Sequence, residues 1–115
     1  MKKTEMIKSN RKFRFLYRKG KTLANPYLAL YAFPNKQNKN MLGITVNKKI
    51  GKAVVRNRIK RLIKESYRLS EDRIKDGYDI IVVSRFKMAG ADFKRTNRSF
   101  LDLCGKLDLL KKEGM

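Results

Sequence analysis

A positively charged amphipathic segment between Asn47 and Arg68 constrains this chain more than any other part of its sequence. From Lys48 to Arg68 it carries nine lysines or arginines and a single acidic residue, Glu65. At about 100° per residue, a helix that begins near Lys52 has an apolar face, which can pack on a sheet, and an opposite face that is basic. The apolar face comprises Val55, Ile59, Leu62, Ile63, Ser66 and Leu69, with Tyr67 at its edge, and the opposite face comprises Asn57, Lys60, Arg61, Lys64 and Arg68. The pattern predicts a helix that binds nucleic acid.

The expected start of this helix concentrates positive charge where charge of that sign is locally unfavourable. A cation near a helix N-terminus costs roughly 0.3–1 kcal/mol, because the helix dipole is positive there. Four cations nevertheless surround Gly51, the expected cap: Lys48, Lys49, Lys52 and Arg56. Free backbone N–H groups combined with cations favour phosphate binding. The alternative is a solvated charged face, but such faces normally mix both signs of charge.

Net charge narrows the class of partner. Thirty lysines and arginines against ten aspartates and glutamates give a formal charge of +20, most of which lies in residues 1–21 and 48–68. Charge of this density indicates a polyanionic partner. A membrane partner is not expected, because no segment is suited to insertion and no apolar run follows the basic N-terminus as it does in a signal peptide.

Length and cysteine content predict one intracellular domain. The 115 residues favour a single domain over residues 1–115, which the basic helix makes a candidate RNA-binding domain, and its ends, about 1–8 and 111–115, are expected to be flexible. The single cysteine, Cys104, excludes an internal disulfide and fits a reducing cytoplasm. Cys104 shares the apolar face of a helical stretch with Phe100 and Leu107, so we expect it to be a core residue rather than a reactive thiol.

The sequence offers no recognisable catalytic group. It contains no histidine, and one cysteine is too few for a cysteine metal site. The acidic residues are scattered, and the glycines lack the spacing of a phosphate-binding loop. We therefore expect no catalytic residue, assign no metal ligand, and expect another molecule to perform any reaction that this protein serves.

Hydrophobic periodicity predicts alternating helices and strands. Four β-branched residues in succession near position 80 are typical of a buried central strand, and the Asn- and Lys-rich stretch 34–40 is expected to be a hairpin connection. The predicted elements are a helix from Ser9 or Asn10 to Gly20, strands at 27–33 and 41–46, a helix from about Lys52 to Leu69, a strand at 78–83 and a helix that begins near Asp92.

The strand at 27–33 has an aliphatic face and an aromatic face. Leu28, Leu30 and Ala32 alternate with Tyr27, Ala29, Tyr31 and Phe33. The aliphatic face is expected to be core. Aromatic rings separated by a small residue either stack on unpaired bases or pack under a helix such as the one that bears Phe13, Leu16 and Tyr17. Spacing alone leaves both interpretations open.

The central motif resembles the signature of the bacterial ribonuclease P protein subunit. The resemblance is carried by the run KKIGKAVVRNRIKRLIKESYR, with its Arg-Asn-Arg core at Arg56, Asn57 and Arg58. It extends over nearly the whole chain, since further residues fall in family positions: Phe13, Tyr17, Gly20, Ala24, Asn25, Tyr31 and the IIVVSR strand. The resemblance implies a non-catalytic subunit that binds the catalytic RNA and precursor tRNA and promotes removal of the 5′ leader. It further implies Mg²⁺ held mainly by the RNA. No obligate protein partner is evident.

The resemblance also implies a fold and a set of binding residues. The fold is an α/β (α+β) two-layer sandwich in the order αβββαβα, similar to a domain of a ribosomal protein. Its β-α-β crossover is left-handed, whereas general physics favours a right-handed one. A cleft for the single-stranded leader is implied at Phe13, Tyr17 and Tyr31, although family members often have Phe where Tyr17 stands. The residues expected to bind catalytic RNA are Lys48, Lys49, Lys52, Arg56, Asn57, Arg58, Lys60, Arg61, Lys64 and Arg68.

Two rival classes share some of these features. A ribosomal-type structural RNA-binding protein would have the same charge and size and would also lack catalytic groups. An intrinsically active nuclease is disfavoured by the absent histidine and the dispersed acidic residues.

Overall fold

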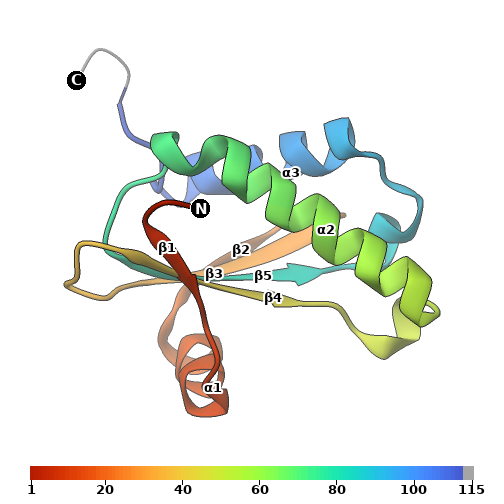
Figure 1. The fold of residues 1–115 in the computed structure, drawn as a ribbon, viewed down its shortest axis with the longest axis horizontal. Coiled ribbons are helices and arrows are strands. Elements are labelled where there is room, and N and C mark those ends of the chain that lie inside the picture. The colour runs from red at the N-terminus through yellow and green to blue at the C-terminus, as the bar shows by residue number, and fades with distance from the viewer. Residues whose placement is uncertain (113–115) are drawn as a thin grey trace.

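A five-stranded sheet carries helices α2 and α3 on one face and helix α1 on the other (Figure 1). The computed structural model describes residues 1–112. The expected order αβββαβα is confirmed, with one further strand, β1, before it. The elements are β1 (Thr4–Met6), α1 (Asn10–Lys19), β2 (Lys21–Ala24), β3 (Leu28–Pro34), β4 (Asn40–Thr45), α2 (Ala53–Ser70), β5 (Tyr78–Ser84) and α3 (Phe93–Lys106), with short 3-10 helices η1 (Lys48–Ile50), η2 (Glu71–Arg73) and η3 (Phe86–Gly90).

Strand β5 occupies the centre of the sheet. The strand order is β1-β4-β5-β3-β2, in which β5 pairs in parallel with β4 and antiparallel with β3. Ile80 and Val82 point into the core under α2 and α3, while Ile81 points towards α1. A strand that is apolar on both faces is buried on both, so the prediction of a central strand is confirmed. Strands β4 and β5 with α2 between them form the β-α-β unit.

The predicted hairpin between β3 and β4 is wrong. Strand β5 lies between these two strands, so the connecting segment 35–39 passes over the beginning of β5 instead of closing a hairpin. Asn35 accounts for this path: its backbone N–H donates to the Gly77 carbonyl at 2.8 Å, and its Nδ2 donates to Asp79 Oδ1 at 3.0 Å. The composition of residues 34–40 indicates a turn, but it carries no information about a strand that arrives from elsewhere in the chain.

The larger core lies between the sheet and the helix pair α2 and α3. The expected aliphatic face of β3 and the apolar stripe of α2 both contribute to it. The stripe is rotated relative to the prediction, because Leu69 is 58% exposed while Tyr67 is fully buried. Helix α3 packs beside α2 and brings Phe100 to within 6.0 Å of Tyr67, ring centroid to centroid, which draws that edge of α2 inward. Cys104 is a core residue of α3, and burial raises the pKa of its thiol to about 12.

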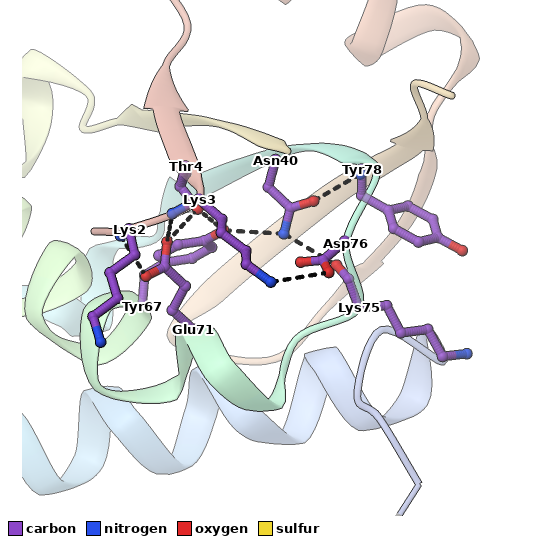
Figure 2. Close-up of polar contacts among 9 residues, drawn as sticks. All are labelled: Lys2, Lys3, Thr4, Asn40, Tyr67, Glu71, Lys75, Asp76 and Tyr78. Carbon is purple, nitrogen blue, oxygen red and sulfur yellow. Dashed lines mark hydrogen bonds and ion pairs between the residues drawn. The ribbon is translucent and has the colours of Figure 1, made fainter. Parts of the chain in front are cut away.

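Strand β1 replaces the flexible end that was expected over residues 1–8. It pairs in parallel with β4, and its backbone is held by the carboxylate of Glu71 at the end of α2. That carboxylate accepts the backbone N–H of Lys2 at 2.8 Å, the backbone N–H of Lys3 at 3.3 Å and the Thr4 hydroxyl at 2.6 Å (Figure 2). The N-terminus is therefore anchored by a residue distant in sequence.

A chain of hydrogen bonds extends this anchor into the core. The Thr4 hydroxyl gives its only proton to Glu71, so Tyr67, 2.7 Å away, donates to Thr4. Tyr67 in turn accepts from Nδ2 of Asn40 at 3.3 Å, and Oδ1 of Asn40 accepts the backbone N–H of Tyr78 at 2.8 Å (Figure 2). Burial raises the pKa of Tyr67, against the effect of these hydrogen bonds, so its hydroxyl stays protonated and able to donate. The network thus satisfies the buried polar groups of Tyr67 and Asn40, whereas within residues 1–112 Arg56 Nε, Ser66 Oγ and Asn97 Oδ1 are buried without a hydrogen-bond partner.

Residues near both ends of the described chain contact η2, the turn that follows α2. Beyond α3, the backbone N–H of Lys111 donates to the Arg73 carbonyl at 2.7 Å. The remainder of the expected flexible tail at 111–115 lies outside the described residues from position 113 onward. Within residues 1–112, no helix combines the length and the apolar character needed to cross a membrane.

Candidate nucleic-acid interface

The basic motif begins in η1 and continues into α2. Asn47 caps η1, its Oδ1 accepting the backbone N–H of Lys49 at 2.8 Å. Lys52, not Gly51 as predicted, is the N-cap of α2, and no side chain caps the helix. Gly51 adopts an extended backbone before this cap. The first turn of α2 therefore has free backbone N–H groups and no acidic residue, as expected for a surface that meets phosphate.

The polar face of α2 presents cations that are mostly unpaired. The predicted RNA-binding residues on this surface are exposed, apart from the half-buried Arg56. Among the described residues, Arg68 is the one of these cations that forms an ion pair, with Glu65 one turn earlier. Arg68 is therefore partly neutralised, whereas the remaining cations are available to a polyanion. The exposed residues of the set are Lys48, Lys49, Lys52, Asn57, Arg58, Lys60, Arg61, Lys64 and Arg68.

Arg58 connects α2 to the start of α3. Its guanidinium donates to the carbonyl of Ala91 at 2.6 Å. Arg58 also lines a shallow hollow together with Arg61 and Phe93, between the two helices. A guanidinium held on one side presents its remaining donors in a fixed direction, which suits recognition of phosphate.

Three aromatic residues predicted to line a cleft come together between α1 and the sheet. The Tyr17 ring lies edge-on to that of Tyr31, with centroids 4.9 Å apart, and 6.3 Å from that of Phe13. Tyr17 is 41% exposed, while Phe13 and Tyr31 are half-buried. Tyr31 thus combines the two alternatives left open by its spacing, because it packs under α1 and still offers part of its ring to the surface.

Gly43 explains how the Phe13 ring reaches the sheet. A Cβ atom on Gly43 would lie 2.7 Å from the Phe13 ring, closer than any side chain tolerates. Phe15 and Phe33 form a second contact between α1 and β3, with ring centroids 5.1 Å apart. Phe15 was not predicted as a cleft residue, although it lies two positions after Phe13 and is 38% exposed. Its aromatic character was the available signal.

Tyr27 does not belong to this cluster. It precedes β3 and packs against the core under α2 and α3, whereas Phe33 packs on the α1 side. Alternation along a strand places residues 27 and 33 on one face only if both lie within the strand, and β3 begins at Leu28.

Helix α1 surrounds the aromatic cluster with further positive charge. Arg11, Arg14, Arg18 and Lys19 are exposed, and Lys12 forms an ion pair with Asp79 at 3.0 Å. Within the described part of the chain, no group of three or more His, Cys, Asp or Glu side chains is arranged to hold a metal ion.

Comparison with known proteins identifies close relatives over nearly the full length. The family model for ribonuclease P matches residues 1–108. The ribonuclease P protein component of Clostridium kluyveri is 46% identical over 107 residues, which cover 91% of this chain and 96% of the relative. That of Clostridium perfringens is 41% identical over 114 residues, covering 93% and 91% of the two chains.

Solved structures give the same result. The RNase P protein of Staphylococcus aureus superposes with a TM-score of 0.85 at 33% identity, covering 92% of this chain and 97% of that one. The RNase P protein of Thermotoga maritima superposes with a TM-score of 0.78 at 32% identity, covering 85% and 93%. The likeness therefore extends to the whole arrangement of sheet and helices.

Proposed function

The chain belongs to the family of ribonuclease P protein components, and we propose that it binds the catalytic RNA of that enzyme through α2 and the 5′ leader of precursor tRNA through the aromatic cluster. The function of this family is the removal of the 5′ leader from tRNA precursors, and this chain has that function as a protein subunit of the endoribonuclease. The reaction itself, in this proposal, takes place on the RNA.

The arrangement of two different surfaces carries the proposal. The α2 surface is basic and largely unpaired, which suits the regular phosphates of a folded RNA. The aromatic cluster offers ring faces and edges, which suit the unpaired bases of a single strand. A ribosomal-type RNA-binding protein has no need of the second surface, and the family match also argues against that alternative.

The two surfaces adjoin at one end of the sheet. The hydrogen bond between Tyr17 and Thr45 places the aromatic cluster at the end of β4, and Asn47 and η1 follow β4 in the chain. A substrate bound in the cluster thereby lies next to the RNA bound by η1 and α2. The protein contributes affinity and orientation for the precursor rather than chemistry.

The proposal places Mg²⁺ with the RNA. In this scheme Mg²⁺ ions bound by the RNA assist the cleavage reaction, and the lysines and arginines of the protein bind RNA. We also place the protein in the cytoplasm, supported by a single buried cysteine and by its bacterial relatives.

The test is a cleavage assay on precursor tRNA at low Mg²⁺. The purified protein alone is expected to leave the precursor intact. The catalytic RNA alone is expected to cleave it slowly, and addition of the protein is expected to accelerate cleavage at the 5′ end of the mature sequence. Cleavage by the protein alone, or an RNA-catalysed rate that the protein leaves unchanged, would show the proposal to be wrong.

A further inference from the structure

A second combination of aromatic and basic side chains lies away from the aromatic cluster, at Tyr27. This residue lines a surface hollow of about 290 Å³ formed with η3 and the start of α3. Two cations reach over its ring: Lys87 Nζ lies 5.9 Å and Arg95 Cζ lies 5.4 Å from the ring centroid. No local sequence pattern groups these three residues, which come from the segment before β3, from η3 and from α3.

The hollow is strongly positive. An adjoining depression is lined by Lys94, Arg95 and Arg98, all of them exposed. None of these three residues, nor Lys87, forms an ion pair with a described carboxylate. The acidic residue in both depressions is Asp92, whose Oδ1 already accepts the backbone N–H of Arg95 at 2.8 Å as the N-cap of α3.

The ring of Tyr27 is the planar group of this hollow, and the cations above it are weakly held. Phe86, which precedes Lys87 in η3 but does not line the hollow, is a further large apolar side chain that is 65% exposed. Contacts between cations and a ring at 5.4–5.9 Å contribute little free energy at an exposed site. A ligand that offers both negative charge and an aromatic ring can replace them at little cost.

The hollow continues the surface of α2. Arg58 of α2 donates to the carbonyl of Ala91, and Ala91 itself lines the hollow of Tyr27. By contrast, the aromatic cluster of Phe13, Tyr17 and Tyr31 joins α1 to the sheet, and α1 covers the opposite face of the sheet (Figure 1). An RNA that lies on α2 therefore passes the Tyr27 hollow, and a strand bound under α1 does not.

We propose that the Tyr27 hollow binds an unpaired nucleotide of the RNA that α2 binds, the catalytic RNA, with its phosphate between Lys87 and Arg95 and its base against Tyr27. The inference rests on the function proposed above and adds a third contact surface to it. Lysine and arginine position RNA through phosphate, and an aromatic ring stacks on bases that are not paired. The site thus selects a loop or bulge rather than a continuous duplex.

The first experiment compares variants that lose the same charge at different places on the surface. Lys87→Ala and Arg95→Ala remove cations from the hollow, while Lys106→Ala removes one from the far end of α3, where it pairs with Asp102. Affinity for the catalytic RNA is measured across a salt series. Each hollow variant is expected to bind roughly tenfold more weakly than Lys106→Ala, with a log–log salt slope reduced by about one.

The second experiment separates stacking from charge. Tyr27→Phe keeps the ring and is expected to retain wild-type affinity, whereas Tyr27→Leu is expected to lose about five- to hundredfold. Because Tyr27 packs partly on the core, the melting temperature of each variant is measured as well. A loss of affinity by a variant that is fully folded at the assay temperature is a loss of RNA contact.

The outcomes distinguish this inference from the proposed function. If the wild type assembles with the catalytic RNA but Lys87→Ala and Arg95→Ala bind it as Lys106→Ala does, the Tyr27 site is refuted and the proposed function stands. If the hollow variants lose affinity only for precursor tRNA, or for an acidic protein, the assignment to catalytic RNA is likewise refuted. If the wild type fails to bind the catalytic RNA, both proposals fail together.

Discussion

The hydroxyl of Tyr17 lies 3.1 Å from Oγ1 of Thr45, and this contact ties α1 to the last residue of β4. The basic η1 turn begins shortly after Thr45, so the exposed ring of the aromatic cluster and the first cations of the motif share one edge of the molecule. One continuous RNA path can therefore pass both the aromatic cluster, where bases would stack, and η1, where phosphates would bind.

Replacing Tyr31 by Leu is expected to weaken precursor tRNA binding selectively. Leu keeps apolar volume under α1 but removes the ring face, and stacking is worth ~1–3 kcal/mol per base. Affinity of the assembled enzyme is measured for precursors with long and short leaders, with mature tRNA as the leaderless control. Assembly with catalytic RNA should change little. Equal weakening with and without a leader would show that Tyr31 acts only in the core.

Arg58→Ala and Arg61→Ala are expected to differ in stability although both weaken RNA assembly. Each removes a guanidinium from α2, but Arg58 also donates to the Ala91 carbonyl. A hydrogen bond from a charged donor contributes about 1.5–3 kcal/mol, and exposure of Arg58 places the loss at the lower end of that range. Thermal unfolding of the two variants, together with their affinities for the catalytic RNA, provides the measurement. Identical melting temperatures would contradict a structural role for Arg58.

RNA affinity is expected to depend steeply on salt. If six to ten phosphates are contacted, affinity falls by ~10³–10⁵ between about 50 and 200 mM salt, because each contact releases counterions. The measurement is a binding isotherm for catalytic RNA at several salt concentrations. Among the cations of α2, Arg68→Ala should reduce the slope less than Lys60→Ala, because Arg68 is already paired with Glu65. A shallow slope for the wild type would mean that the unpaired cations of η1 and α2 are not the binding surface.

Features determined by neighbouring residues were predictable from the sequence. Ser9 accepts the backbone N–H of Lys12 as the N-cap of α1, Gly20 ends that helix, and Asp92 caps α3, as local patterns indicated. The run Ile80–Val82 is apolar at every position, so its burial on both faces of the sheet follows from its composition. The basic face of α2 follows from helical periodicity alone.

Features determined by distant partners were not predictable in the same way. Strand β1 is only three residues long, and its anchor, Glu71, is remote in sequence. Strand β2 consists entirely of exposed residues, so no alternation marks it, and only family resemblance implied a third strand before α2. The hairpin prediction failed for the related reason that β5 inserts between β3 and β4.

The same distinction applies to the candidate site. Phe13, Tyr17 and Tyr31 were implied by family positions, and the structure brings them together. The grouping of Tyr27 with Lys87 and Arg95 depends on how η3 and α3 return to the start of β3, which no local pattern encodes. The orientation of α2 beside α3 exposes Leu69. This orientation was likewise not predictable without the tertiary structure.

Glu71→Gln is expected to loosen β1 and to flatten the acid side of the stability profile. Burial alone would raise the pKa of the Glu71 carboxyl, but the Thr4 hydroxyl, the backbone N–H groups of Lys2 and Lys3 and the N-terminal charge together hold it below the ordinary value of 4.5. A carboxyl with a lowered pKa in the folded state stabilises that state above the pKa of the unfolded chain. The contribution is lost as pH falls through the folded pKa.

The wild type should therefore lose melting temperature as pH falls below about 4.5, by more than Glu71→Gln does over the same interval. Asp72→Asn, which removes the same charge from the neighbouring exposed residue of η2, is the matched control and should follow the wild type. Amide exchange of Asn40, whose N–H donates to the Lys3 carbonyl at 2.9 Å, reports directly on the docking of β1. Faster exchange at Asn40 in Glu71→Gln at neutral pH is expected, since the glutamine amide accepts the three N-terminal donors more weakly than a carboxylate. Wild type and Glu71→Gln profiles that run parallel through the acid range, with unchanged exchange at Asn40, would mean that pairing with β4 alone holds the N-terminal strand.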